Sequence, residues 1–302
     1  MLQAKKSGEG VFYNMQNRMM KRKFKKLFSI DLIIYLIFIF VTFVTIIPLL
    51  KIFVDSIDAT ANYGINLWPK KAVLSGYEII VTTVALYKPF LVSIYVTLVG
   101  TLLGLAVSTV AGYVLMQYEM PGRKFLSYML LFTMIFHGGM VPTYLAMRQY
   151  DLINSLWAII LPASLNVYNT VLMRNFFEGI PVSLFDAASI DGCSPVKIFF
   201  SVILPLSKAA LASIGLMFAV SYWNEYTNFT IYISDSNLRN FQVMLRNLII
   251  EDTSLAAASS AGVYQNTVKS AAIMVAIIPF MILYPFLQKY FVKGINMGAV
   301  KE

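Results

Sequence analysis

The chain has 302 residues, a formal net charge of +9, a hydrophobic share of 58% and a charged share of 13%. Its mean hydropathy is +0.70. Soluble globular domains carry about a quarter charged residues, so this composition excludes an ordinary soluble protein and predicts a chain that folds in a bilayer. The positive charge does not indicate a nucleic-acid partner, because many of the basic residues gather beside an apolar segment at the amino terminus.

Residues 1–28 form this basic segment, which we expect on the cytoplasmic side of the membrane, where Lys and Arg accumulate. The apolar stretch that begins near Ile30 is roughly twenty or more residues long and has no small-residue cleavage site. We therefore interpret it as a retained span and not as a secretory signal. The basic residues of the segment are Lys5, Lys6, Arg18, Lys21, Arg22, Lys23, Lys25 and Lys26.

Six apolar segments have the length needed to cross about 30 Å of hydrocarbon. Pro142, Pro162 and Pro205 interrupt the third, fourth and fifth, as helices in a bilayer tolerate. We predict an all-α polytopic plasma-membrane protein whose permease domain covers 29–292, and six crossings return the tail 293–302 to the cytoplasm. The spans are expected near 29–54, 89–117, 124–146, 153–176, 198–228 and 266–292.

The second span contains a run of small residues that includes Gly100 and Gly104. Such a run lets helix backbones approach closely, either within one bundle or at a dimer seam. Two long outer segments, 57–88 and 229–265, mix aromatic with polar residues and could meet a soluble partner. The outer side is not free of positive charge, because it holds Lys70, Lys71, Lys88, Arg148, Arg239 and Arg246.

The segment 178–197, between the fourth and fifth spans, is predicted to be a cytoplasmic loop that contains a short helix. Pro181 suits the first turn of a helix, and Gly192 suits the position just after a helix end. Ser194 and Pro195 are typical of the N-cap and first turn of the next helix. A helix of about ten residues is marginal alone in water, so it needs a partner to dock against. Its apolar side consists of Leu184, Phe185, Ala188 and Ile190.

The spacing of this loop resembles the EAA loop of ABC importer permeases. That pattern reads Glu-Ala-Ala, three residues, Gly, nine residues, Ile, one residue, Leu-Pro. The chain has Asp186 for the usual Glu and Val202 for the usual Ile, and otherwise matches. The residues that carry the match are Asp186, Ala187, Ala188, Gly192, Val202, Leu204 and Pro205.

Further stretches resemble the carbohydrate-uptake branch of these permeases, from about the second span to the end of the chain. Within that branch, the sequence is most similar to permeases that handle complex or oligomeric sugars. These stretches are GGMVPTYLAMRQYDLINSLWAIILP (138–162), VLMRNFFEGIP (171–181), SYWNEYTNF (221–229) and FVKGINMGAVKE (291–302).

The resemblance implies a six-helix, type I-like permease whose short cytoplasmic helix couples it to an ATPase. It implies contact with the ATPase through Asp186, Ala187, Ala188 and Gly192. The implied partners are a second, non-identical permease, two ATP-binding subunits, an extracellular solute-binding protein and a sugar, expected to be an oligosaccharide. ATP and Mg would be bound by the ATPase subunits, because this chain has no GxxxxGK[ST] loop and is not expected to be an enzyme.

Polar and aromatic residues at the end of the fifth span could line a sugar path, because rings stack on sugar faces and amides match hydroxyls. An interfacial aromatic belt explains them equally well. Asn166 and Asn169 are weaker candidates, since helix-to-helix hydrogen bonds are the commoner use of such residues. His137 is expected to be a packing or hinge residue. The path candidates in the fifth span are Tyr222, Trp223, Asn224, Glu225 and Tyr226.

Three other functions compete with the importer hypothesis. An ion-coupled secondary transporter would need ionisable residues at mid-bilayer and repeated halves, and the sequence shows few of the former and no repeat. An integral-membrane enzyme would need a close set of nucleophile, base or metal ligands. With one His and one Cys, Cys193, neither a zinc site nor an intramolecular disulfide is expected. The third alternative, a permease-like subunit that signals and does not transport, is not excluded by the sequence.

Overall fold

The structure, a computed structural model, describes residues 31–60, 64, 66–117, 119–136, 138–250 and 265–299, with side chains described up to residue 285. Within these ranges the regular elements are helices, and a single isolated bridge joins Asp58 to Ala72. The predicted all-α fold is confirmed. The basic segment 1–28 and His137 lie outside the described residues.

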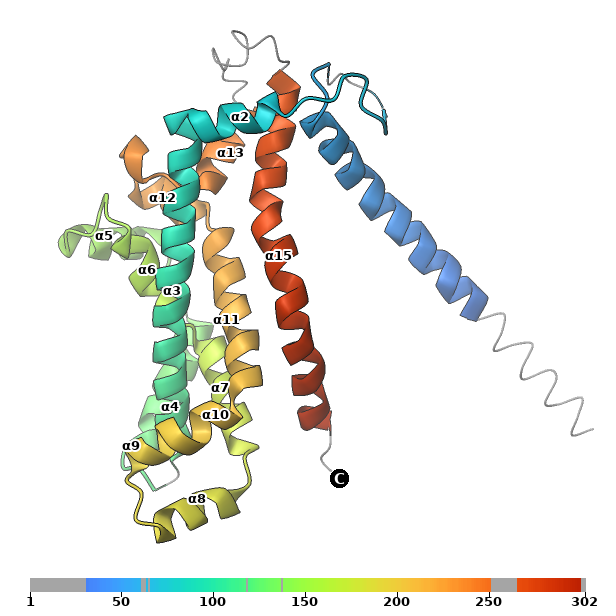
Figure 1. The fold of residues 1–302 in the computed structure, drawn as a ribbon. Coiled ribbons are helices and arrows are strands. Elements are labelled where there is room, and N and C mark those ends of the chain that lie inside the picture. The colour runs from blue at the N-terminus through green and yellow to red at the C-terminus, as the bar shows by residue number, and fades with distance from the viewer. Residues whose placement is uncertain are drawn as a thin grey trace, which may run out of the picture.

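The helices follow one another with short connections (Figure 1). The first runs from Asp31 to Ser56. After it come α2 (Ser75–Thr82), α3 (Val84–Met116), α4 (Arg123–Ile135), α5 (Met140–Gln149), α6 (Trp157–Ser164), α7 (Val167–Glu178), α8 (Val182–Ile190), α9 (Pro195–Ile198), the π-helical turn η1 (Phe199–Ile203), α10 (Leu204–Leu206), α11 (Lys208–Trp223), α12 (Thr227–Tyr232), the 3₁₀ turn η2 (Ser236–Leu238), α13 (Phe241–Ile250) and α15 (Gln265–Ala299).

Three helices are long and apolar enough to cross a membrane, namely Asp31–Ser56, Val84–Met116 and Gln265–Pro285. They coincide with the first, second and sixth predicted spans. The fourth predicted span corresponds to α6 and α7, which are separated by Leu165 and Asn166. The count of six crossings stays a prediction, because length and composition alone identify at most five spans in the described part of the chain.

The third and fifth predicted spans, which the sequence shows to be interrupted by Pro142 and Pro205, are sharply bent. The helix Pro195–Leu206 meets Lys208–Trp223 at 80°, and α4 meets α5 at 117°. Pro205 causes part of the first bend, because it has no N–H to donate to the carbonyl of Ser201, and the wide π turn η1 precedes it directly. The crossing part of the fifth span is therefore α11 alone.

The core of the bundle lies around α3, which packs against α6, α7 and α11. The small residues of α3 make this packing possible. A Cβ on Gly100 would lie 2.6 Å from the ring of Tyr222, and one on Gly104 would lie 2.7 Å from the ring of Phe218. Of the two uses that the sequence left open for this run, the structure shows packing within the chain.

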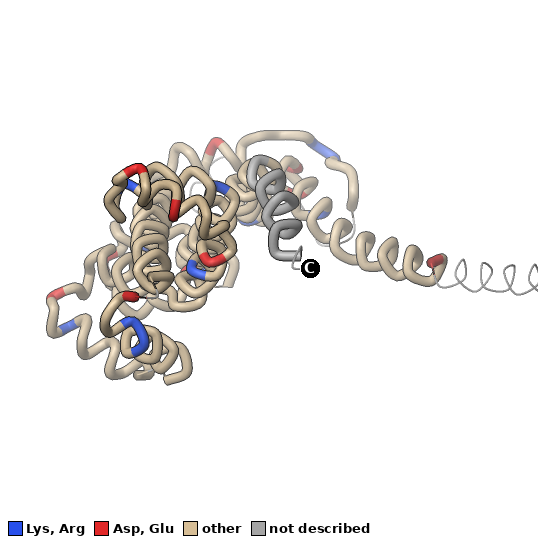
Figure 2. The backbone as a smooth tube through the Cα atoms, turned by 90° about the horizontal axis from the view of Figure 1, so that it is seen from below, with Lys and Arg blue, Asp and Glu red and all other residues tan. Residues whose placement is uncertain are grey.

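The first helix stands apart from this bundle. Figures 1 and 2, seen from perpendicular directions, both show it leaning away from the other helices. None of its most apolar window is buried within the chain. Figure 2 also shows that the bundle itself carries few charged residues along its helices. From residue 31 to residue 50 the first helix is therefore exposed and mostly apolar, and no described part of the chain covers it.

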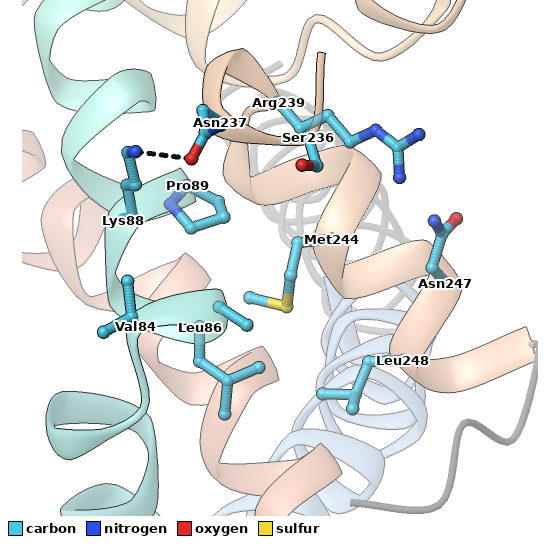
Figure 3. A pocket seen from close by; sticks show the side chains of 11 residues that line it. Val84, Leu86, Lys88, Pro89, Ser236, Asn237, Arg239, Met244, Asn247 and Leu248 are labelled. Atoms are coloured by element: carbon cyan, nitrogen blue, oxygen red, sulfur yellow. Dashed lines mark hydrogen bonds between the residues drawn. The ribbon is translucent and has the colours of Figure 1, made fainter. Parts of the chain in front are cut away.

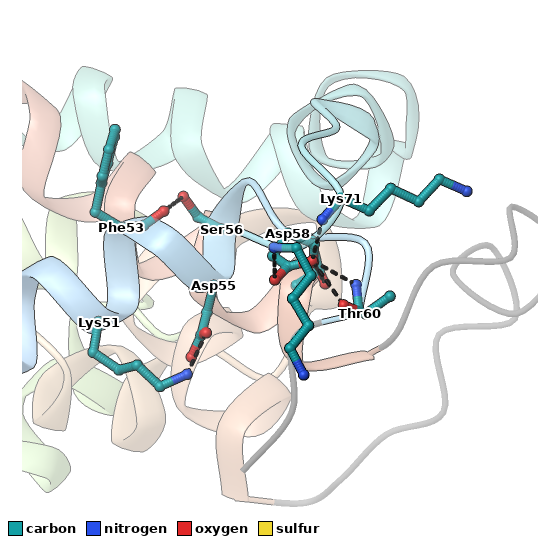
Figure 4. Close-up of polar contacts among 9 residues, drawn as sticks. Lys51, Phe53, Asp55, Ser56, Asp58, Thr60 and Lys71 are labelled. Atoms are coloured by element: carbon teal, nitrogen blue, oxygen red, sulfur yellow. Dashed lines mark hydrogen bonds and ion pairs between the residues drawn. The ribbon is translucent and has the colours of Figure 1, made fainter. Parts of the chain in front are cut away.

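The segment after the first helix is fastened by Asp58 (Figure 4). Its carboxylate accepts hydrogen bonds from the N–H of Lys70 at 2.9 Å, of Lys71 at 3.3 Å and of Thr60 at 3.0 Å, and from the Thr60 hydroxyl at 2.9 Å. The hydroxyl of Thr267 donates to the Asp58 carbonyl at 2.6 Å, which joins the segment to α15. The described residues around Asp58 thus form a clasp that fastens this segment to the bundle.

Candidate coupling and translocation sites

The short helix expected between Pro181 and Gly192 is present as α8. Pro181 is the N-cap, one residue earlier than the predicted first turn. The helix ends in a Schellman turn, in which the N–H of Cys193 donates to Ala188 O at 3.0 Å and the N–H of Gly192 donates to Ser189 O at 3.0 Å. Gly192 has φ +73°, and a Cβ there would meet no atom within 4 Å. The glycine is therefore required by backbone conformation and not by space.

The faces of α8 differ from the expected apolar side. Ala188 is buried at 8% exposure, and Phe185 packs beside it on the core of the chain. Val182 and Ile190, by contrast, are 69% and 85% exposed. The predicted apolar side thus divides into an inner half that holds α8 to its own bundle and an outer half that no part of the described chain covers. Leu184, at 41% exposure, belongs to the outer half.

The residues of the EAA pattern divide in the same way. Asp186 and Ala187 are exposed on α8, so both are free to meet a partner. Ala188 lies against its own bundle, and its expected contact with an ATPase stays a prediction. Val202 and Leu204 are half-buried on the core and Pro205 is exposed at the bend, so these three shape the connection to α11.

The helix that follows α8 is attached firmly to α3. Ser194 is the N-cap of α9, as predicted, and its hydroxyl accepts a hydrogen bond from the N–H of Lys197 at 3.3 Å. The hydroxyl of Tyr113 donates to Pro195 O at 3.0 Å, and its ring lies 5.0 Å from the ring of Phe199. A displacement of α8 would therefore be transmitted through one tight turn to α9 and α3.

An ion-pair cluster that the sequence analysis missed lies where α7 leads into α8. Glu178 Oε1 accepts from Arg174 Nε at 2.8 Å, and Arg123 Nη2 lies 3.7 Å from the same oxygen. Arg123 Nε also donates to Leu115 O at 2.6 Å, so the cluster joins the ends of α3, α4 and α7. The sequence signal was the opposite charges of Arg174 and Glu178 four residues apart on a helix.

Two of the proposed path residues are packing residues instead. Tyr222 is buried, and its hydroxyl donates to Ile160 O at 2.8 Å. Trp223 is buried between Phe90 and Phe280, and its Nε1 donates to Ala276 O at 3.1 Å. Both side chains fix α11 to neighbouring helices, so the expectation that they line a path is corrected.

The next three residues, Asn224, Glu225 and Tyr226, lie at the turn between α11 and α12 and remain accessible to different degrees. Glu225 Oε1 accepts from the N–H of Asn228 at 2.9 Å, which stabilises the start of α12. The guanidinium of Arg246 lies 4.4 Å from the centre of the Tyr226 ring, a cation–π contact. Asn224 and Tyr226 keep their predicted candidacy for a sugar path.

Asn166 and Asn169 are used for helix structure. Asn166 is the N-cap of α7, and its Oδ1 accepts from the N–H of Asn169 at 3.0 Å. Asn169 itself is buried. The neighbouring Thr170 hydroxyl lies 3.4 Å from that of Ser108 on α3, so this end of α7 is bonded to the bundle. Asn166 and Asn169 thus serve the start of α7 itself, and the link to α3 is made by Thr170.

A pocket of about 580 Å³ lies at the end of the molecule opposite α8, between the start of α3 and the α12–α13 connection (Figures 1 and 3). The sequence analysis did not predict it, because its walls come from segments about 150 residues apart. Its lining residues are Val84, Ala85, Leu86, Lys88, Pro89, Ser236, Asn237, Arg239, Met244, Asn247 and Leu248.

Long apolar helices with a short, exposed helix held on a tight turn at one end of the bundle (Figure 1) fit a membrane permease that is coupled to a separate subunit. Comparison with known protein families supports this class of protein. Residues 101–297 match the family described as binding-protein-dependent transport system inner membrane component, and the chain belongs to this family. Its members are transport subunits of ABC importers, which work with a separate ATPase and a solute-binding protein.

Several relatives carry substrate names. The chain is 37% identical over 279 residues to the polygalacturonan/rhamnogalacturonan transport system permease protein YtcP of Bacillus subtilis, covering 90% of this chain and 98% of that protein. It is 29% identical over 264 residues to the arabinooligosaccharides transport system permease protein AraQ of Halalkalibacterium halodurans, with 84% and 90% covered.

A solved structure is also similar. A chain of a bacterial ABC transporter involved in the import of the acidic polysaccharide alginate superposes with a TM-score of 0.81 at 29% identity. The match covers 86% of this chain and 96% of that one. The family membership, and the multi-pass membrane location that it implies, therefore hold over nearly the whole chain.

Proposed function

We propose that this permease forms half of the translocation pathway of an importer that takes up an oligosaccharide. The observation that carries the proposal is α8, a helix fixed by its inner face to the bundle and left uncovered on its outer face. The names of the relatives support the sugar class, since they include transport systems for polygalacturonan, rhamnogalacturonan and arabinooligosaccharides.

In this proposal α8 docks in a cleft of an ATP-binding subunit. Val182 and Ile190 supply exposed apolar contacts, and Asp186 supplies a charge for a basic or N–H partner. ATP and Mg would be bound by two such subunits, which supply the energy of hydrolysis. The end of the molecule that carries α8 would then lie in the cytoplasm, together with both termini of the chain. The end that carries the pocket would face the outside of the cell.

A second permease subunit would complete the pathway, and we propose that it is a non-identical relative. Most of the apolar surface of the first helix is uncovered by the described part of this chain and is available to a partner helix. Because lipid covers such a surface equally well, the choice of a permease partner rests on the resemblance to carbohydrate permeases. A heterodimer is the arrangement that the resemblance to carbohydrate permeases implies.

The test is uptake by the complete complex, reconstituted in proteoliposomes with its ATPase subunits and binding protein. The probes are labelled oligomers of galacturonate, of arabinose and of alginate. ATP-dependent accumulation of at least one of them supports the proposal. Accumulation of none, in vesicles whose ATPase is active, contradicts the sugar assignment. Accumulation that follows an ion gradient without ATP contradicts the importer mechanism itself.

A further inference from the structure

The pocket at the end opposite α8 carries two positive charges. Lys88 stands on α3, and its Nζ donates to Asn237 Oδ1 at 2.7 Å, while Arg239 lies at the rim on the following loop (Figure 3). Among the described side chains that line the pocket, none is acidic. The only nearby carboxylate on the same loop, Asp235, is turned into that loop, where it accepts from the N–H of Asn237 at 2.8 Å.

The backbone adds to this positive character. The first turn of α3 supplies Val84, Ala85 and Leu86 to the wall. The amino-terminal end of a helix carries partial positive charge and favours an anion nearby. The helix end and the two cations together favour a negative charge in the pocket.

The rest of the lining suits a sugar ring better than a bare ion. Pro89, Met244 and Leu248 give an apolar surface for the C–H face of a ring, whereas Ser236 offers a hydroxyl that can bond a sugar hydroxyl. Ligand pockets commonly enclose about 300–1,000 Å³, and this one falls within that range. A single acidic side chain of a docking protein would leave most of the volume empty.

We propose that this pocket binds a carboxylate-bearing sugar unit of the substrate as it enters the pathway. Arg239 and Lys88 attract the carboxylate, and the apolar wall supports the ring. The permease would then discriminate in favour of acidic oligosaccharides at its outer end. The inference rests on the proposed sugar-importer function and adds the charge of the substrate to it.

The experiment measures binding of trigalacturonate and of neutral galactotriose to the purified complex in nanodiscs, without the binding protein. We expect the acidic trimer to bind at least about tenfold more tightly than the neutral one, the size expected of one charge-assisted contact. Arg239→Gln and Lys88→Met should each reduce trigalacturonate binding by about tenfold. Lys71→Gln is the matched control, because Lys71 is an exposed cation at the same end and does not line the pocket.

In the binding experiment, three outcomes overturn the inference. They are equal binding of the two trimers, unchanged binding in both pocket variants, and a loss in the Lys71→Gln control as large as in the pocket variants. Uptake with the binding protein present separates the two proposals. If the Arg239→Gln variant loses uptake of acidic and neutral oligomers equally, the pocket serves as a docking site for the binding protein. It then does not distinguish acidic from neutral sugars. Persistence of ATP-driven uptake in every variant retains the importer function while it refutes the pocket.

Discussion

At the scale of single residues, the end of α8 depends on one backbone conformation. Gly192 adopts φ +73° in open space, so any penalty for replacing it comes from the backbone alone. Asparagine tolerates this left-handed region much better than a β-branched residue does. Within the described part of this chain, the position thus allows a substitution test in which contacts of the new side chain play no part.

Gly192→Val should strain the turn by about 1–3 kcal/mol and disturb the direction in which α8 leaves the bundle. We expect the variant to assemble but to lose most of the substrate-stimulated ATPase activity of the complex. Gly192→Asn is the control and should retain nearly full stimulation. Equal activity in the two variants would show that the left-handed turn has no part in coupling.

Asp58 gives a second test at the residue scale, outside the membrane-spanning segments. Burial alone would raise the pKa of Asp58, but hydrogen bonds from the N–H of Lys70, from the N–H and hydroxyl of Thr60 and from the N–H of Lys71 outweigh it and lower the pKa from 3.8 to about 2. A carboxyl group with a lowered folded-state pKa stabilises the fold above its unfolded value and loses that contribution as the pH falls toward 2.

Asp58→Ala should therefore destabilise the protein by about 2–3 kcal/mol at neutral pH, because it leaves several N–H donors without an acceptor. Thermal unfolding of the purified protein in detergent measures the change. Asp55→Ala is the matched control, since Asp55 pairs only with Lys51 one turn earlier on the first helix and should cost about 0.3–0.5 kcal/mol. Similar losses in the two variants would show that the clasp around Asp58 adds no stability.

At the scale of elements, the ends of α3, α4 and α7 meet at Glu178 just before the chain turns into α8. The side chains of Arg123, Arg174 and Glu178 are mostly buried, so their interactions are less screened than those of an exposed pair. This joint, formed by Arg123, Arg174 and Glu178, fixes the end of α7 from which the chain continues into α8.

Glu178→Gln should weaken the joint by about 1 kcal/mol and lower the ratio of stimulated to basal ATPase activity. Glu119→Gln serves as the control, because Glu119 is exposed in the turn between α3 and α4 at the same end of the molecule. The thermal midpoint and the ATPase ratio are measured for both. An unaltered ratio in Glu178→Gln, with a lowered midpoint, would restrict the joint to a purely structural role.

The elements also show what could be predicted from the sequence. Local chemistry was sufficient for α8 and its neighbours, because Pro181, Gly192 and Ser194 act on their own turns. The sharp bend before α11 was missed, although Pro205 signals it, because hydropathy reports apolar length and not direction. Tyr222 and Trp223 were misjudged since their burial depends on helices far away in the sequence.

At the scale of the whole molecule, two functional regions lie at opposite ends of one bundle (Figure 1). At one end α8 exposes Val182, Asp186 and Ile190 on the face turned away from the bundle, and the other end presents a cationic pocket and the Asp58 clasp. The helices between them, α3 and α11, are packed through glycine contacts that leave little room for independent movement. A push on α8 would therefore move the bundle as a unit.

The most direct test of this account is substrate-stimulated ATPase activity of the complex reconstituted in lipid, comparing the native chain with Asp186→Lys and Ile190→Asp. The control is Glu119→Lys, which reverses an exposed charge at the same end but outside α8. The account predicts that both α8 variants assemble with the other subunits yet lose stimulation, while the control keeps it. Unaltered stimulation in both α8 variants would contradict the claim that this helix couples transport to ATP.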